Sequence, residues 1–230
     1  MHFEHAPGIW SDFPELAPGV LHVDGIHKSV DVASRSAPYF EIATARLANG
    51  PESELPEIQA WRRTFSRMGL KPTQYRCASE SLLRRFRKEQ SLPHLHPLVD
   101  LCNAISVAYA IPIAVIDIDQ VAGGITVRRA TGDERYLTFG GDMEHPEPDE
   151  VIFADIAGEA HARRWTNRQS GHSAVQDGTS RVLIVAEAMH ATGPADIARL
   201  VTDVASEIDA TWSLTPTSAI LTAGSPRFEF

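Results

Sequence analysis

Apolar residues recur at helical spacing through the first half of the chain and again near its end. Residues 58–68 show this most clearly, because Ile58, Trp61, Phe65 and Met68 fall on one stripe and Gly69 follows them. This spacing predicts an amphipathic helix that ends at the glycine. Further helices are predicted over residues 36–48 after Pro38, from a Ser79 cap to about Gln90, from Pro97 to about Tyr109, and from near Pro194 onward.

The pattern changes to alternation in the second half of the chain, which predicts strands. Strands are predicted over residues 20–26, 112–118, 125–130, 151–156, 160–166 and 181–189, with a short strand or arm over residues 222–230. Residues 181–189 are apolar almost throughout, which is typical of a central strand. We therefore expect an α+β (mixed α/β) fold with a central, mainly antiparallel or mixed sheet covered by helices.

Composition supports this expectation. The chain has 230 residues, of which 43% are hydrophobic and 22% charged, which suits one domain with a packed core. We expect residues 1–230 to form that single domain, with its core at about 20–210 and terminal arms outside it. No apolar run is long enough to span a membrane and the first residues do not resemble a signal peptide, so a cytoplasmic location is expected by default.

The net charge of −9 excludes a protein that holds nucleic acid by general attraction. Any contact with nucleic acid must use a local basic segment. Two such segments are present, "RRFRK" at 84–88 and "RRWTNR" at 163–168.

Several common sites are absent from the sequence. There is no GxxxxGK[ST], GxSxG or HExxH motif, and neither Cys77 nor Cys102 belongs to a CxxC pair. The pair His94 and His96 is better explained as part of a helix entry than as a metal site. We expect neither a metal nor another cofactor.

Residues 163–175, "RRWTNRQSGHSAV", concentrate planar and neutral hydrogen-bonding groups and contain no acid. Arginine matches a phosphate or carboxylate in shape, and tryptophan offers a stacking surface. We expect a binding or catalytic loop rather than a solvated strand edge. In this interpretation Arg164 or Arg168 holds a phosphate or carbonyl group and Trp165 forms a wall.

A second candidate surface lies on the helix that follows Pro97. His96, Asp100, Asn103 and Val107 share one face of it, away from the apolar stripe. Two interpretations stay open for the polar members of this face. They bond to the backbone of an adjoining loop, as buried polar groups usually do, or they form the wall of a ligand pocket.

One ordered series of motifs resembles a known module. "LVDLCNAISVAYAIPIAVIDIDQVAGGITVRRATGDE" at 98–134 carries V-D-x-x-N, P-x-x-x-x-D, D-x-D-x-x-x-G-G-I-x-V-R and G-x-E, and "VIFADIAGEAHA" at 151–162 continues it. The series resembles the B3/B4 domain, the tRNA-binding and editing module of the phenylalanyl-tRNA synthetase beta subunit. The resemblance covers about residues 75–190 well and 20–210 loosely, and no aminoacylation domain accompanies it. It implies a free-standing protein with the B3/B4 fold.

The resemblance also implies a site between the Asn-bearing helix, the strand after Pro112 and the later loop. Asn103 and Asp100 match the family's Asn and Asp, but Ala114 stands where the family has a pocket histidine. Gly171, followed by His172 and Ser173, stands opposite the family's acidic pocket residue. The tyrosine that the family module removes from tRNA is therefore not the expected substrate, because its buried hydroxyl would lack a partner.

Two functions follow as alternatives. The first is trans-editing, in which the ester of a mischarged aminoacyl-tRNA is hydrolysed. The second is a binding protein for tRNA or an amino acid that kept the fold and lost the chemistry, and hydrolysis of another small ester or amide is a third, weaker possibility. For the first function, the expected catalytic residues are Asn167, Gln169 and His172, and the residues expected to contact substrate are Asn103, Asp100, Ala114, Arg164, Trp165, Arg168, Ser170, Gly171 and Ser173. The expected partner is the acceptor end of tRNA, delivered by a synthetase in one version of this hypothesis; the sequence gives no oligomeric state.

Overall fold

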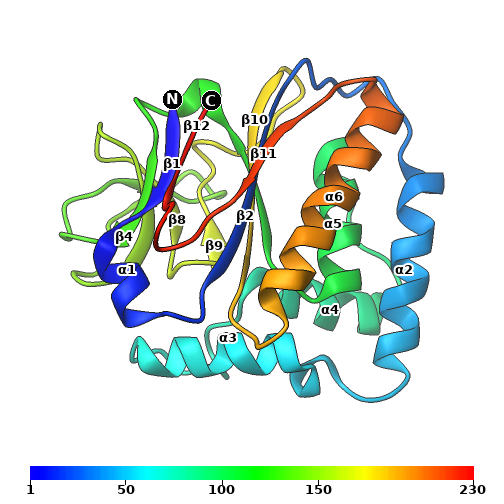
Figure 1. Ribbon diagram of the computed structural model, residues 1–230, viewed down its shortest axis with the longest axis horizontal. Coiled ribbons are helices and arrows are strands. Elements are labelled where there is room, and N and C mark those ends of the chain that lie inside the picture. Colours follow the sequence, from blue (N-terminus) through cyan, green and yellow to red (C-terminus); the bar gives the residue numbers. More distant parts are fainter.

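The computed structural model describes residues 1–230 as three layers, two sheets and a layer of helices (Figure 1). The helices are α1 (Pro7–Asp12), α2 (Ala33–Leu47), α3 (Pro56–Arg67), α4 (Ala78–Glu89), α5 (Pro97–Tyr109) and α6 (Gly193–Trp212), with 3₁₀ turns η1 (Glu52–Glu54) and η2 (Ile118–Gln120). The strands are β1 (His2–His5), β2 (Ala17–Asp24), β3 (Ile113–Asp117), β4 (Ile125–Arg129), β5 (Tyr136–Leu137), β6 (Met143–Glu144), β7 (Val151–Ala154), β8 (Ala160–Arg163), β9 (Arg168–Gln169), β10 (Arg181–Ala188), β11 (Thr217–Ile220) and β12 (Arg227–Glu229).

The strands form two main sheets and a small hairpin. One sheet has the order β12-β1-β4-β7-β8-β9, the other has the order β11-β2-β10-β3, and β5 pairs with β6. All neighbouring strands are antiparallel except β1 and β4, which are parallel. The expected α+β fold with mainly antiparallel or mixed sheets is confirmed, and the structure adds that the strands divide between two sheets.

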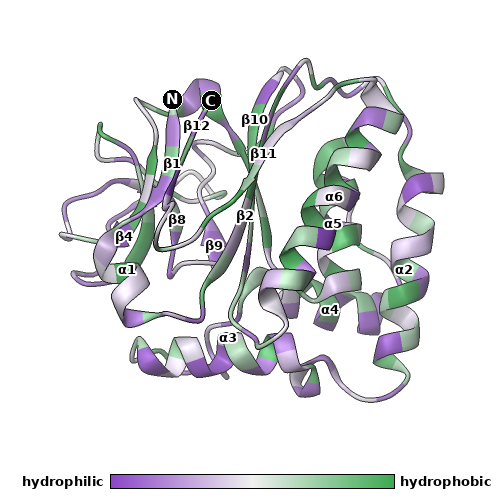
Figure 2. Cartoon of the chain, viewed as in Figure 1, coloured by the Kyte–Doolittle hydropathy of each residue, from purple (hydrophilic) through white to green (hydrophobic).

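The apolar residues of β10 explain this division. Val182, Ile184 and Ala186 pack toward α2, α5 and α6, whereas Leu183 and Val185 pack toward the six-stranded sheet. Successive side chains of a strand point to opposite faces, so a strand that is apolar throughout must be covered on both. Figure 2 shows the hydrophobic colour along β10 and on α5 in the middle of the molecule. The sequence signal for a central strand was therefore correct.

The ends of the chain are part of the six-stranded sheet. β1 pairs with β12 on one side and with β4 on the other, so both termini lie together at the edge of this sheet. Phe3 and Phe228 are buried there, at 0% and 8% exposure. The sequence pattern predicted neither β1 nor α1, because each is only a few residues long.

Two predicted helix starts differ from the structure. α2 begins at Ala33 and contains Pro38, so the helix starts before the proline rather than after it. α4 begins at Ala78 with Cys77 as its cap, so Ser79 is the second residue of the helix and not the predicted cap. Cys77 and Cys102 are both free and buried, and no helix combines the length and apolar character needed to cross a membrane.

Candidate functional site

The loop after β8 joins the edges of the two sheets. Arg164 and Trp165 both have positive φ angles, 48° and 59°, which turn the chain sharply at the end of the strand. Non-glycine residues seldom adopt this conformation, and here the backbone N–H groups of both residues are bonded, to Glu150 Oε1 at 2.9 Å and Val151 O at 2.7 Å. The strand therefore ends at Arg163, three residues before the predicted end.

Beyond the turn, the loop binds the edge strand β3. The side-chain amide of Gln169 donates to Val115 O at 2.7 Å, Asp117 N donates to Ser173 O at 2.9 Å, and Ala174 bridges to Ile116. Backbone groups at a sheet edge need partners. The loop supplies them, and so it fixes β3 against the six-stranded sheet.

A cavity of about 50 Å³ lies where β3, the loop and the start of α4 meet. Its lining includes Ala78, Pro112, Ala114, Trp165, Thr166, Asn167, Arg168, Gln169 and Glu187. Four of the sequence-predicted loop residues, Trp165, Asn167, Arg168 and Gln169, are thus brought together with Ala114. A water molecule needs about 10–15 Å³ on this measure, so the cavity holds about four waters and is far smaller than the ~150 Å³ that accommodates benzene.

The two amide side chains of the cavity are held by the backbone. Asn167 Nδ2 donates to Arg76 O at 2.7 Å, just before α4, and Gln169 Nε2 donates to Val115 O. Each amide therefore has an oxygen that the protein has not engaged as an acceptor. Ala78 N also donates to Thr166 O at 2.8 Å, so the first turn of α4 is attached directly to the cavity wall.

Thr166 is one of the cavity residues that the sequence did not indicate. Its Oγ1 atom is buried and has no hydrogen-bond partner within the protein. Most buried polar groups have a partner, and an unpaired one costs about 1–3 kcal/mol. This hydroxyl therefore marks the position where a bound molecule would find a free hydrogen-bonding group.

Glu187 is the acidic group of the cavity. It is 2% exposed, and its Oε1 atom lies 2.6 Å from His5 Nε2 and 2.9 Å from Trp165 Nε1. It was not predicted as a site residue, although an acid within the apolar strand "RVLIVAEAM" was a signal for one. Both partners are buried and both contact Oε1, so the observed role of this oxygen is to hold the cavity wall.

Trp165 belongs to the core instead of presenting a stacking surface. It is 0% exposed, with its ring 4.9 Å from Phe13 and 5.3 Å from Trp61 in edge-to-face geometry. Its indole edge reaches the cavity wall, but a base or an amino-acid ring cannot stack on its face. The predicted wall is present, and the predicted stacking face is not.

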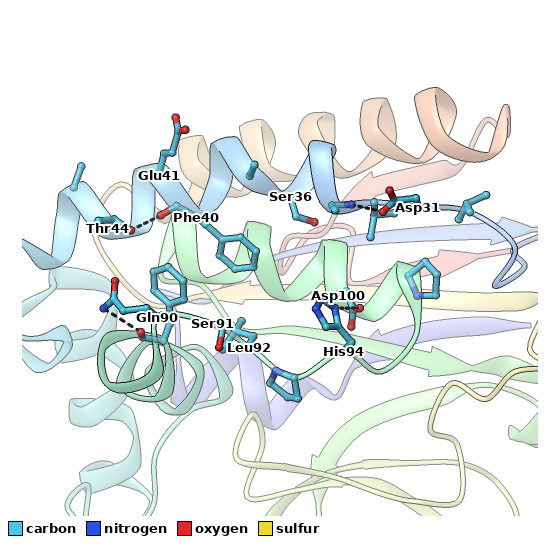
Figure 3. A pocket seen from close by; sticks show the side chains of 18 residues that line it. Asp31, Ser36, Phe40, Glu41, Thr44, Gln90, Ser91, Leu92, His94 and Asp100 are labelled. Carbon is cyan, nitrogen blue, oxygen red and sulfur yellow. Dashed lines mark hydrogen bonds and ion pairs between the residues drawn. The ribbon is translucent and has the colours of Figure 1, made fainter.

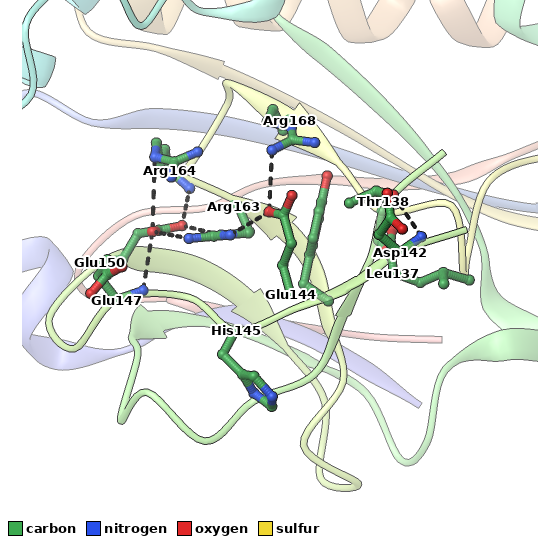
Figure 4. Close-up of polar contacts among 12 residues, drawn as sticks. Leu137, Thr138, Asp142, Glu144, His145, Glu147, Glu150, Arg163, Arg164 and Arg168 are labelled. Carbon is green, nitrogen blue, oxygen red and sulfur yellow. Dashed lines mark hydrogen bonds and ion pairs between the residues drawn. The ribbon is translucent and has the colours of Figure 1, made fainter. Parts of the chain in front are cut away.

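The arginines of the loop are paired with two glutamates (Figure 4). Arg163 is 3% exposed and contacts Glu150 at 2.9 Å and Glu144 at 2.6 Å. Burial opposes ionisation of Glu150, but the hydrogen bonds from Arg163 outweigh it and lower the pKa of this carboxyl. Arg163 therefore has a structural role, the neutralisation of the buried Glu150.

The other two arginines are more accessible. Arg164 lies over the ring of Tyr75 at 4.7 Å and is 3.9 Å from Glu150. Arg168 is 41% exposed, contacts Glu144 at 3.3 Å and is the basic side chain that lines the cavity. Of the two arginines predicted to hold substrate, Arg168 lines the cavity and Arg164 does not.

Ser170, Gly171 and Ser173 lie behind the cavity and do not line it. Ser170 Oγ donates to Leu137 O at 3.0 Å, and a Cβ on Gly171 would lie 2.9 Å from Thr138 O. Both serines are 0% exposed. His172 is half-buried and also lies outside the cavity lining, with its ring 6.0 Å from that of His161.

Ser173 takes part in a buried polar chain. Its Oγ atom is 2.8 Å from His161 Nδ1, and His161 Nε2 is 3.4 Å from Asp155 Oδ2. A hydroxyl, an imidazole and a carboxylate in this order resemble a hydrolase triad. All three residues are at most 6% exposed and none lines the cavity, so a substrate cannot reach the hydroxyl.

Asp100 and Asn103 do not join the loop residues. Asp100 lines a separate groove of about 750 Å³ between α2, α4 and the segment before α5 (Figure 3). Its carboxylate accepts from Leu95 N at 2.9 Å and contacts His94 Nδ1 at 3.2 Å. For Asp100 the structure supports the interpretation of backbone bonding in an adjoining loop; Asn103 is half-buried and lines neither cavity.

Comparisons with known proteins show the family of the chain. Residues 60–207 match the family model of the B3/4 domain. The chain is 23% identical over 168 residues to the phenylalanine–tRNA ligase beta subunit of Photorhabdus laumondii, a match that covers 71% of this chain and 21% of that protein. The chain thus spans about a fifth of that relative's length.

A solved structure has the same fold. It is an N-terminal fragment of the phenylalanyl-tRNA synthetase beta subunit from Pyrococcus horikoshii, with a TM-score of 0.50 and 9% sequence identity. The similarity covers 95% of this chain and 53% of the fragment. The match over residues 60–207 covers more than half of the chain and shows that it belongs to the B3/4 domain family.

Proposed function

We propose that this protein hydrolyses the ester of a mischarged aminoacyl-tRNA in the cavity between β3 and residues 165–169. The relatives are phenylalanyl-tRNA synthetase beta subunits, which supports an aminoacylated tRNA end as the ligand. The single observation that carries the proposal is the buried, unpartnered hydroxyl of Thr166 in the cavity wall. A bound ester or water satisfies this hydroxyl.

The cavity groups suit ester hydrolysis. Water adds to the carbonyl carbon, the ribose oxygen leaves with a proton, and the products are the free amino acid and uncharged tRNA. The uncommitted amide oxygens of Asn167 and Gln169 accept hydrogen bonds from the water or from the ammonium group of the aminoacyl ester. Arg168 donates to the carbonyl oxygen, where negative charge develops in the transition state.

The size of the cavity indicates the substrate class. A space of about 50 Å³ is about a third of the volume that holds a benzene ring. We therefore propose an amino acid with a small side chain, such as alanine, serine or glycine, rather than tyrosine or phenylalanine.

One specific observation favours the alternative, a non-catalytic binding protein. The titratable group of the cavity, Glu187, is already bonded to His5 and Trp165, and His172 lies outside the cavity. Since Oε1 is committed and the cavity lining contains no histidine, a reaction here depends on Oε2 of Glu187 or on the substrate's own hydroxyl to take the proton. A hydrolase releases the amino acid from aminoacyl-tRNA and a binding protein does not, so a deacylation assay distinguishes the two functions.

The test is deacylation of a panel of aminoacyl-tRNAs by the wild type and by Thr166→Val. Valine replaces the hydroxyl with a methyl group of similar shape, so removal of an unpaired buried hydroxyl leaves stability equal or higher. We expect deacylation of a small aminoacyl-tRNA to fall at least tenfold in Thr166→Val, with an unchanged or raised melting temperature.

Arg168→Ala provides a second variant, and Arg181→Ala is its matched control because Arg181 is similarly exposed, at 46%, and lies outside the cavity. We expect loss of activity in the first and wild-type activity in the second. Absence of deacylation across the whole panel, with retained tRNA binding, would establish the binding protein instead.

A further inference from the structure

The basic residues of the chain are gathered in one segment. Residues 58–88 contain nine of the chain's 21 Lys and Arg and a single acid, Glu80. The rest of the chain carries 12 basic and 29 acidic residues. A protein with net charge −9 therefore contains one strongly basic segment, which comprises most of α3, the loop after it and most of α4. Acids from outside the segment pair with three of its arginines, Glu15 with Arg67, Glu52 with Arg87 and Glu89 with Arg85.

The single acid of this segment is neutralised in place. Glu80 is 0% exposed, and its carboxylate lies 2.5 Å from Arg62 and 3.4 Å from Arg76. One buried carboxylate between two arginines leaves a net positive charge at the start of α4. The basic character of the surface is thus not cancelled by the acid within it.

The exposed face of α4 continues this charge away from the cavity. Arg84, Arg85 and Lys88 are all exposed, and we call them the α4 basic face. Arg85 is paired with Glu89 at 2.8 Å, whereas Arg84 and Lys88 have no acidic partner. Two unpaired, flexible cations four residues apart on one helix surface are placed to contact a repeating anion.

α4 connects this face to the proposed active site. Ala78, in its first turn, lines the cavity. Arg85 follows it seven residues later on the same side of the helix, and the unpaired Arg84 and Lys88 are turned from that side by about a third and a quarter of a turn. The helix has 12 residues and so is about 18 Å long. The α4 basic face is therefore within one helix length of the cavity, close enough for one polyanion to contact both.

We propose that the α4 basic face binds the phosphate backbone of the tRNA acceptor stem and directs its aminoacylated end into the cavity. This inference rests on the proposed function, since it takes tRNA as the ligand of the cavity. Phosphate contacts of this kind position a nucleic acid without reading its sequence. They also explain how an acidic protein binds RNA, because the acidic remainder of the surface confines binding to this face.

The experiment measures binding of a fluorescently labelled, uncharged tRNA transcript to the full chain at several salt concentrations between about 50 and 200 mM. Arg84→Glu/Lys88→Glu is compared with Arg35→Glu/Arg199→Glu, a matched pair on α2 and α6 with 46% and 64% exposed side chains. Both variants change the net charge equally, so a difference between them reports the location of binding rather than total charge.

We expect the α4 pair to weaken binding at least fivefold and to reduce the slope of log affinity against log salt by about two, one for each lost phosphate contact. The α2/α6 pair should weaken binding less than twofold. Equal weakening in the two pairs, or no weakening in the α4 pair, would overturn the inference. The inference would also be overturned if the chain does not bind tRNA and instead self-associates through Arg84 and Lys88 in a salt-sensitive way.

Deacylation measured in parallel separates this inference from the proposed function. If the Arg84→Glu/Lys88→Glu variant deacylates tRNA with an unchanged KM, the proposed hydrolase function is supported and the α4 basic face is not the tRNA-binding surface. If tRNA binding depends on Arg84 and Lys88 but no deacylation is detected, the α4 basic face is supported as the tRNA-binding surface and the proposed hydrolase function is wrong.

Discussion

The indole nitrogen of Trp165 donates to the carboxylate of Glu187 at 2.9 Å, in the wall between the cavity and the core. Trp165 comes from the turn after β8, and Glu187 comes from the end of the central strand β10. The bond thus ties the loop of one sheet to the central strand of the other. His5 from β1 approaches the same carboxylate oxygen at 2.6 Å.

The first prediction concerns this bond. Glu187→Leu removes the acceptor of both His5 and Trp165, whose polar atoms then stay buried without partners. An unsatisfied buried group costs about 1–3 kcal/mol, so we expect the free energy of unfolding to fall by about 3 kcal/mol in urea denaturation. Glu187→Gln keeps an acceptor and should lose clearly less. A Leu variant as stable as the wild type would contradict a structural role for Glu187.

The second prediction separates the buried polar chain from catalysis. Ser173→Ala removes the hydroxyl that lies 2.8 Å from His161 Nδ1. We expect a stability loss of about 1 kcal/mol and wild-type deacylation per folded molecule, because no substrate reaches this residue. The measurement pairs thermal melting with the aminoacyl-tRNA assay. Activity lost together with unchanged stability would instead make Ser173 the nucleophile of a triad.

The third prediction concerns stability at low pH. Burial acts to raise the pKa of Asp155, but the neighbouring His161 and hydrogen bonds from the backbone N–H groups of Ala122 and Glu159 outweigh it and lower the pKa to about 2. A carboxyl with a lower pKa in the folded chain stabilises the fold above its ordinary pKa of 3.8. That contribution is lost as the pH falls from about 4 toward 2.

Asp155→Asn cannot show this loss, because an amide does not titrate. The free energy of unfolding of both proteins is compared at about pH 5 and pH 2.5. We expect the decrease between these two pH values to be about 1.5 kcal/mol smaller for Asp155→Asn than for the wild type. Urea denaturation at each pH measures both. Identical pH dependence in the two proteins would show that the Asp155 pKa is not lowered by folding.

The sequence pattern was sufficient for the fold class and most long elements. The stripe of Ile58, Trp61 and Phe65 is buried as predicted, and the apolar run of β10 is a central strand. The sequence pattern could not predict the number of sheets. Alternation in a strand shows that one face is covered, but it does not show whether helices or a second sheet cover that face. The short elements β1 and α1 carry too few residues for any period to be visible.

The sequence also showed only part of the candidate site, because residue types do not reveal which polar groups the fold itself uses. Residue type showed that the loop after β8 was polar and rich in planar groups, but not which groups would be consumed by the fold. Arg163 is used to neutralise Glu150, and Ser170 bonds to the backbone of a neighbouring strand. Thr166 gave no signal, because the absence of a partner for its hydroxyl becomes visible only when every neighbour is placed.

The last prediction tests the cavity itself. Ala114 lines it from β3, and a larger apolar side chain at this position would occupy space that the substrate needs. Ala114→Leu adds three carbon atoms to a cavity of about 50 Å³. Because they enter existing space, we expect a stability change within about 1 kcal/mol. Deacylation of small aminoacyl-tRNAs should fall at least tenfold, whereas Ala114→Ser, which is nearly the same size, should retain activity. Wild-type hydrolysis by the leucine variant would place the reaction outside this cavity, and the cavity would then serve only as the joint between the two sheets.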